Sequence, residues 1–145
     1  MQFLWILLVT SFMTSGPTWE TDFGKAKQAA IKSHKLILVN FSGSDWCGPC
    51  IRMHKEIFET PAFNNFASAH LVLVNADFPR LKKHQLSEEQ QQKNDQLAER
   101  YNKKGIFPLT ILLSEDGKVL KVWEGFTTPA PDAFINEIKS ATQFP

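Results

Sequence analysis

The sequence predicts an α/β domain in which a central mixed β-sheet is flanked by helices on both faces. Two short apolar runs, 36–41 and 71–74, indicate strands buried on both faces, and a helical pattern lies between them. That order implies a right-handed parallel crossover. An Asp-Gly pair between two later apolar segments is typical of an antiparallel hairpin. The 145 residues suffice for one domain with a single ordinary core.

The first half of the chain contains the segments expected to form two helices and two strands. Residues 20–34 predict a helix, because apolar residues recur there at helical spacing. The run Leu36–Phe41 predicts the first buried strand. A second helix is expected from Cys47 to about Thr60, with Pro61 near its end. The run 71–74 predicts the second buried strand.

The second half predicts a polar helix, a hairpin and a closing helix. The stretch 87–101 is rich in Gln, Glu and Lys, and Ser87 followed by Gln90 is the pattern of a capping box, so we expect a surface helix. Strands are expected at 109–113 and 119–123, on either side of the Asp-Gly turn. The segment from Pro131 to about Thr142 has the apolar spacing of an amphipathic helix.

The N-terminus has the shape of a secretory signal peptide. An apolar run, Phe3–Val9, precedes small residues at 14–16, and Glu20 is the first charged side chain. The run is shorter than the roughly 20 residues that span a bilayer, and no Lys or Arg precedes it. We expect a removable leader at 1–16 and a domain at 17–145, and hence an exported, periplasmic or extracytoplasmic protein. The alternative is a buried N-terminal strand or helix.

The composition argues against several classes of protein. Sixteen Lys and Arg against fifteen Asp and Glu give a net charge of +1, and no basic run exceeds two residues. We therefore expect no nucleic-acid partner. Two cysteines supply neither a disulfide-dense miniprotein nor a four-thiolate metal site.

The segment Trp46-Cys47-Gly48-Pro49-Cys50 holds the chemistry, because it joins a buried strand to the start of a helix. Backbone N–H groups and the positive end of the helix dipole favour a thiolate at Cys47 and lower its pKa. We expect Cys47 to be the exposed attacking thiolate and Cys50, one turn further in, to be the more buried resolving thiol. Pro49 restricts the turn and removes one donor, which tunes the thiolate.

Three other interpretations of the cysteine pair fit the sequence less well. Half of a zinc site is one, but no second pair exists and His54 is the only nearby imidazole, so we expect no metal. His54 itself is expected to face the surface or a partner, or else to tune a thiol pKa. A purely structural disulfide would close a loop too short to stabilise the fold much. A chance occurrence conflicts with the strand-turn-helix setting.

The chain resembles the thioredoxin superfamily from about residue 20 to the end. Residues 46–50 are identical to the active-site sequence of thioredoxin, and Gly105-Ile106-Phe107-Pro108 stands where that family has its cis-proline loop. The resemblance implies a thioredoxin fold and a cis Phe107–Pro108 bond packed against the cysteines. It also implies that Trp46, the backbone of Phe107, Pro108 and Gly125 border the substrate groove.

The chain departs from thioredoxin at three places. Asn40 and Leu73 stand where the family has a buried Asp and a Lys, so Asn40 enters the set of expected tuning residues together with Gly48 and Pro49. Asp45 is expected to be exposed beside Cys47, where its negative charge should raise the pKa of the Cys47 thiol slightly. The 78–104 connection is longer than in thioredoxin, as in exported thioredoxin-like proteins and the periplasmic domains of membrane thiol reductases.

The resemblance implies a thiol–disulfide oxidoreductase that needs no metal or organic cofactor. We expect it to act as a reductant on disulfide-containing proteins, with electrons from a membrane thiol reductase, and to be a monomer. An isomerase or oxidase with the same residues is the first alternative. A non-catalytic binding module that holds peptides in the cis-proline groove is the second.

Overall fold

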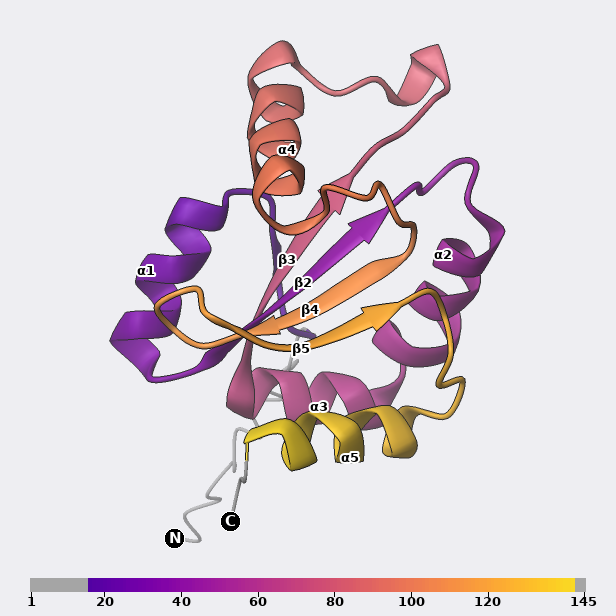
Figure 1. Cartoon of the computed structure of the whole chain (residues 1–145). Coiled ribbons are helices and arrows are strands. Elements are labelled where there is room, and N and C mark those ends of the chain that lie inside the picture. Colours follow the sequence, from indigo (N-terminus) through magenta and orange to yellow (C-terminus); the bar gives the residue numbers. More distant parts are fainter. Residues whose placement is uncertain (1–15, 143–145) are drawn as a thin grey trace, which may run out of the picture.

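A five-stranded mixed sheet forms the centre of the computed structural model, which describes residues 16–142 (Figure 1). The strand order is β1-β3-β2-β4-β5, with β1 and β3 parallel to their neighbours and β4 and β5 antiparallel. The central strand, β2, leads directly into the cysteine motif. The bounds are β1 Trp19–Glu20, β2 Leu36–Ser42, β3 Leu71–Asp77, β4 Leu109–Leu113 and β5 Val119–Glu124. The predicted mixed α/β architecture is confirmed.

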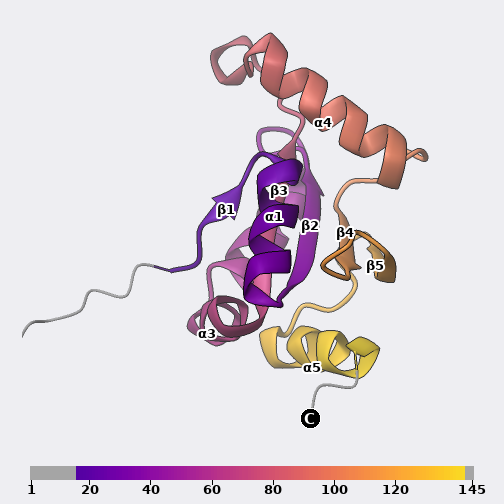
Figure 2. The ribbon, with the colours of Figure 1, turned by 90° about the vertical axis from the view of Figure 1, so that its left-hand side faces the viewer.

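Helices cover both faces of this sheet (Figures 1 and 2). One face carries α1 and, above it, α4; the other carries α2 and its π-helical continuation, with α3 and α5 side by side. The bounds are α1 Phe23–Ser33, α2 Gly48–Met53, the π segment His54–Phe58, α3 Pro61–His70, the 3₁₀ turn Lys82–His84, α4 Glu88–Tyr101 and α5 Pro131–Thr142.

Alternation along β2 divides the core between the two faces. Ile37, Val39 and Phe41 pack on the side of α1, whereas Leu38 packs on the side of α2, α3 and α5. Asn40 falls on this second face, where an apolar residue would be expected, and it is 6% exposed. The strand that precedes the cysteines is therefore buried on both faces, as its apolar run predicts.

The region after the cysteines differs from the expected single helix. The α-helix ends at Met53, a π-helical turn follows, and a separate helix, α3, begins at Pro61. Thr60 Oγ1 accepts a hydrogen bond from the backbone N–H of Phe63, and Pro61 occupies the first turn, where its missing N–H costs nothing. Pro61 therefore starts a helix instead of ending one.

Several other expectations needed adjustment. The short strand β1, the 3₁₀ turn and α3 were not expected. Ile31 and Ile51, which the helical spacing places on apolar faces, are 48% and 40% exposed. At the start of α4, Ser87 Oγ accepts from the N–H of Gln90, but the Gln90 side chain donates to Thr21 O instead of returning to Ser87. Only one half of the capping box forms.

The leader predicted at 1–16 lies almost entirely outside the described residues. Within 16–142, no helix has the length and apolar character needed to span a bilayer.

The hairpin between β4 and β5 turns at Gly117, whose φ of 91° is a conformation that favours glycine.

Candidate active site

Cys47 and Cys50 are joined by a disulfide at the start of α2, with their Cα atoms 5.2 Å apart. Cys47 is the N-cap residue of the helix, and its Sγ accepts a hydrogen bond from the backbone N–H of Cys50 at 3.3 Å. Pro49 lies in the first turn. The first sulfur therefore lies at the positive end of the helix, where a negative charge is stabilised once the disulfide is reduced.

The two cysteines do not differ in exposure as the sequence predicts. Each is 4% exposed, so Cys47 is as buried as Cys50 in the disulfide form. The reason is its position as helix cap, because its side chain folds back over the N-terminus of α2 onto Cys50. What distinguishes the two sulfurs is the hydrogen bond from the helix end to Cys47, and not a difference in burial.

Aromatic side chains join Trp46 to the loop before β4. The Trp46 and Phe107 rings meet edge-on with centroids 5.4 Å apart, and Phe78 contacts Phe107 at the same distance. The Trp46 indole N–H donates to the carbonyl of Phe78 at 2.7 Å. Three segments distant in sequence, the motif, the end of β3 and the 105–108 loop, are thus packed against one another.

The Phe107–Pro108 peptide bond is cis, and Pro108 is buried. The carbonyl of Pro108 accepts a hydrogen bond from the N–H of Gly125 at 2.8 Å, and Gly125 has a φ of 83°. This bond ties the loop before β4 to the chain after β5. Among residues 16–142, no hydrogen bond engages the backbone N–H or carbonyl of Phe107.

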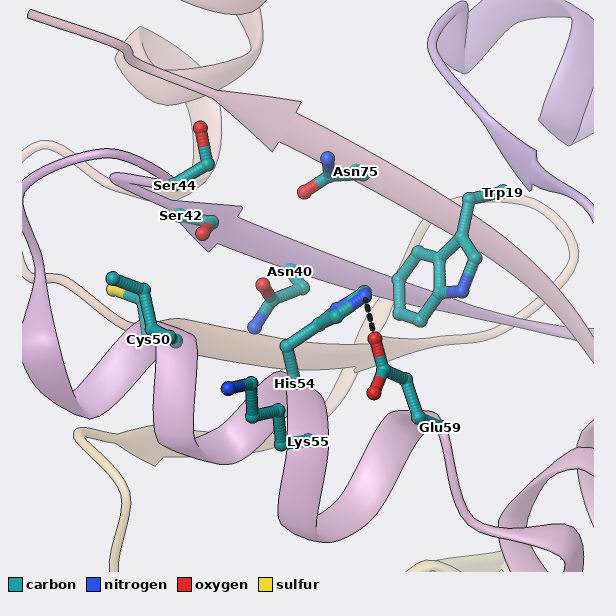
Figure 3. Close-up of a pocket in the computed structure, with 10 residues that line it drawn as sticks. Trp19, Asn40, Ser42, Ser44, Cys50, His54, Lys55, Glu59 and Asn75 are labelled. Atoms are coloured by element: carbon teal, nitrogen blue, oxygen red, sulfur yellow. Dashed lines mark ion pairs between the residues drawn. The ribbon is translucent and has the colours of Figure 1, made fainter.

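A pocket of about 360 Å³, lined mostly by residues with polar side chains, lies beside Cys50 (Figure 3). Asn40 and Asn75 are register partners on β2 and β3, and both side chains line it. Asn40 Nδ2 donates to Thr110 Oγ1 at 3.0 Å, so the amide at the position of the expected acid is held by a neutral partner. Leu73 lies elsewhere on this face of the sheet, 1% exposed in the apolar core.

His54 and Glu59 form an ion pair at the far side of this pocket from Cys50 (Figure 3). The distance from Nε2 to Oε1 is 3.4 Å, and the His54 side chain is 56% exposed. His54 is thus at the surface, as expected, and it borders the same pocket as Cys50. Sequence reasoning missed Asn75, Glu59 and Trp19 as pocket residues, because only strand register and helix packing bring them there.

Asp45 does not lie exposed beside the nucleophile as the sequence predicts. Its side chain is 5% exposed and turns toward the chain after β3. It accepts hydrogen bonds from the N–H groups of Arg80 and Leu81 at 2.9 and 3.0 Å, and it pairs with His84 at 3.1 Å. These bonds, led by the one from Arg80, lower the pKa of Asp45.

Comparisons with known proteins agree with this geometry. A family model described as a thioredoxin-like domain matches residues 23–141. The chain is 39% identical over 123 residues to "Disulfide bond reductase DsbH" of Chlamydia pneumoniae. This alignment covers 85% of this chain and 71% of that protein. It is 35% identical over 98 residues to "Thioredoxin-related protein DsbJ" of the same organism, over 68% of this chain but only 27% of DsbJ.

A solved structure gives the same result for the fold. The structure named "DsbH Oxidoreductase" superposes with a TM-score of 0.81 at 32% sequence identity. The superposition covers 99% of this chain and 96% of that one.

Proposed function

The chain belongs to the thioredoxin-like family and is a thiol–disulfide oxidoreductase, and we propose that it acts as a reductant of protein disulfides. The observation that supports the assignment most strongly is the Cys47–Cys50 disulfide at the N-terminus of α2. The direction is supported by the name of the relative DsbH, a disulfide bond reductase.

In the proposed reaction, the reduced protein begins with a thiolate at Cys47. This thiolate attacks one sulfur of a substrate disulfide, forms a mixed disulfide, and releases the other substrate sulfur as a thiolate. Cys50 then loses its proton and attacks Cys47 Sγ, which releases the second substrate thiol. Two electrons pass to the substrate, and the Cys47–Cys50 disulfide seen in the structure is the product.

The surroundings of the disulfide support separate roles for the other predicted residues. The backbone N–H and carbonyl of Phe107, which form no hydrogen bond within residues 16–142, can pair with an extended substrate chain. Exposed backbone groups of other proteins bind peptides in this way by strand addition. Trp46, Pro108 and Gly125 would border that chain. The pocket beside Cys50, with Asn40 in its wall, offers the Cys50 proton a route to solvent without a buried acid.

A cellular role as an exported reductant requires an electron source outside the cytoplasm. We propose that residues 1–16 direct export, that 17–145 form the working domain, and that a membrane thiol reductase restores the dithiol. We further propose that the protein works as a monomer and needs no metal or organic cofactor. Among residues 16–142, no three His, Cys, Asp or Glu side chains gather as a metal site would require.

Substrate trapping tests the proposed function. Cys50→Ser leaves Cys47 able to attack but removes the resolving thiol, so mixed disulfides with substrate proteins should accumulate on non-reducing gels. Cys47→Ser is the matched control and should form none. If the Cys50→Ser chain forms no mixed disulfides with disulfide-bonded proteins, the proposed reaction is wrong.

The reduction potential separates the reductant from the isomerase or oxidase. Equilibration of the Cys47–Cys50 pair in graded glutathione buffers should give a value near about −270 mV, as for thioredoxin. A value between about −180 and −120 mV would identify an isomerase or oxidant instead. A binding module would keep its cellular role when both cysteines are replaced by serine, whereas a reductant would lose it.

A further inference from the structure

We infer that the segment Phe78–His84 is a substrate-recognition loop, which selects disulfides flanked by acidic residues. The inference rests on the proposed function and assigns a role to the segment between β3 and α4. Three features of the loop support this role: its charge, its attachment to the cysteine motif, and the lack of a carboxylate partner for Arg80, Lys82 and Lys83 among residues 16–142.

The loop is rich in basic residues. It contains Arg80, Lys82, Lys83 and His84, and the chain has no acidic residue from 78 to 87. All four of these side chains are on exposed residues, as is Leu81 at 47% exposure. Within 16–142, no carboxylate forms an ion pair with Arg80, Lys82 or Lys83.

The loop is fixed against the active-site motif. The Arg80 guanidinium lies over the Trp46 ring, 3.6 Å from its centroid, so a cation is held one residue away from Cys47. Asp45 accepts the backbone N–H groups of Arg80 and Leu81 and pairs with His84. The indole N–H of Trp46 donates to Phe78 O. These contacts connect both ends of the loop to residues 45 and 46.

The two acidic residues that contact the loop, Asp45 and Asp77, are already engaged. The Asp45 side chain is 5% exposed and is directed at the loop backbone. Asp77, at the end of β3, accepts the N–H and hydroxyl of Ser44 and the N–H of Phe78. Arg80, Lys82 and Lys83 are therefore exposed cations without a carboxylate partner among residues 16–142, and Arg80 lies on the residue next to Cys47. The complementary ligand is a carboxylate-bearing polypeptide segment.

The aromatic contacts place the loop next to the groove proposed for the substrate chain. Phe78 and Trp46 both pack on Phe107, whose backbone is proposed to pair with that chain. An extended substrate lying there would have its residues on one side of the cysteine beside Arg80. The acidic residues selected should thus be immediate neighbours of the substrate cysteine.

Two synthetic peptides with the same internal disulfide test the inference. One has two Glu residues beside a cysteine, and the other has two Gln residues at the same positions. The reduced full chain should reduce the Glu peptide about three- to tenfold faster than the Gln peptide at low salt, as several exposed charge pairs allow. Raising the ionic strength from about 10 mM to about 1 M should bring this ratio close to one, because the Debye length falls from about 30 to about 3 Å.

Matched variants locate the effect. R80Q/K82Q/K83Q should lower the ratio of the two reduction rates, Glu peptide to Gln peptide, toward one. This expectation does not depend on the absolute rate with the Gln peptide. K32Q/K103Q/K118Q removes the same charge from exposed residues elsewhere and should keep the wild-type ratio. D45N keeps all the cations but loses charge-assisted bonds to the loop, so it should give an intermediate ratio.

The outcomes separate the inference from the function on which it rests. If neither peptide is reduced, the proposed reductase function is wrong. If both are reduced at equal rates, or if R80Q/K82Q/K83Q and K32Q/K103Q/K118Q change the ratio equally, the loop has no role in recognition and the inference is overturned. A preference for anionic lipid vesicles over the Glu peptide would also overturn it.

Discussion

Gly43 and Trp46 approach so closely that a side chain at position 43 would displace the indole. A Cβ on Gly43 would lie 2.6 Å from Trp46 Nε1, well inside normal contact. Gly43→Ala should therefore break the Trp46–Phe78 hydrogen bond and lower the free energy of unfolding by about 1–3 kcal/mol. Urea unfolding of the oxidised protein measures this change.

Gly48→Ala is the control for this substitution. A Cβ on Gly48 meets nothing within 4 Å, and its φ is not in the left-handed region. Alanine there should leave the unfolding free energy unchanged or raise it by up to about 1 kcal/mol, through a less flexible unfolded chain. Equal losses in the two variants would contradict the role given to Trp46.

Glu137 on α5 links that helix to β5 and the loop after it. Its carboxylate accepts the Trp123 indole N–H at 2.6 Å and the Thr128 hydroxyl at 2.8 Å, and these bonds, led by that of Trp123, lower its pKa. A carboxylate with a lowered folded-state pKa stabilises the fold above its unfolded pKa of about 4.3, and this stabilisation disappears as the pH falls through the folded value.

Glu137→Gln should therefore lower the unfolding free energy by about 1 kcal/mol at neutral pH, since the carboxylate is partly exposed and solvent weakens its bonds. The difference from wild type should shrink as the pH is lowered below about 4. Unfolding curves at a series of pH values measure it. Glu124→Gln, at an exposed pair with Lys104, serves as the control and should change little. A difference for Glu137→Gln that persists unchanged at pH 2 would refute the assignment.

At the scale of elements, α3 contributes to the core although its sequence suggested only the end of another helix. Phe63 is fully buried and contacts Phe58 and Phe134, with ring centroids 5.1 and 6.2 Å apart. Phe63→Ala should lower the unfolding free energy by about 3–5 kcal/mol, because it removes buried apolar surface and leaves a cavity. Asn65→Ala, on an exposed position of the same helix, should change it by less than about 0.5 kcal/mol. Similar values for the two would show that α3 does not pack as described.

Elements with a strong local signal were predicted and those defined by long-range packing were not. The continuous apolar runs of β2 and β3, the Asp-Gly hairpin and the amphipathic α5 all appear near their expected bounds. The two residues of β1 are too few for a periodic pattern, and they form a strand only because β3 pairs with them. Pro61 is compatible with the end of one helix or the start of the next. The signal for a helix start was Thr60, which is the N-cap residue of α3.

The same distinction applies to the candidate site. The motif 46–50, Phe107, Pro108 and Gly125 could be found from sequence because short patterns mark them. The attachment of Asp45 to Arg80 could not, since nothing in the sequence relates positions 45 and 80. Asn75 likewise reaches the pocket only through its register with Asn40.

At the scale of the whole molecule, stability should be distributed unevenly between the sheet and α4. Five of the seven residues of β2 are buried, whereas in the fourteen residues of α4 the buried ones are Asn94 and Leu97. The amides of β2 and β4 should therefore exchange only on global unfolding, and those of α4 earlier, by local opening. Hydrogen exchange followed by mass spectrometry tests this, and equal protection of α4 and β2 would contradict it.

The hydrogen bond from Gly125 to Pro108 has a consequence for the time course of biosynthesis. The two cysteines leave the ribosome together, but the segment with Phe107, which packs on Trp46, and the segment with Gly125, which bonds to Pro108, follow much later in the chain. Until those segments dock, the thiols lack the environment that sets their reactivity, and their exchange behaviour is that of any unstructured peptide. An incomplete chain can therefore only be a substrate for thiol–disulfide exchange, and only the complete chain can catalyse it.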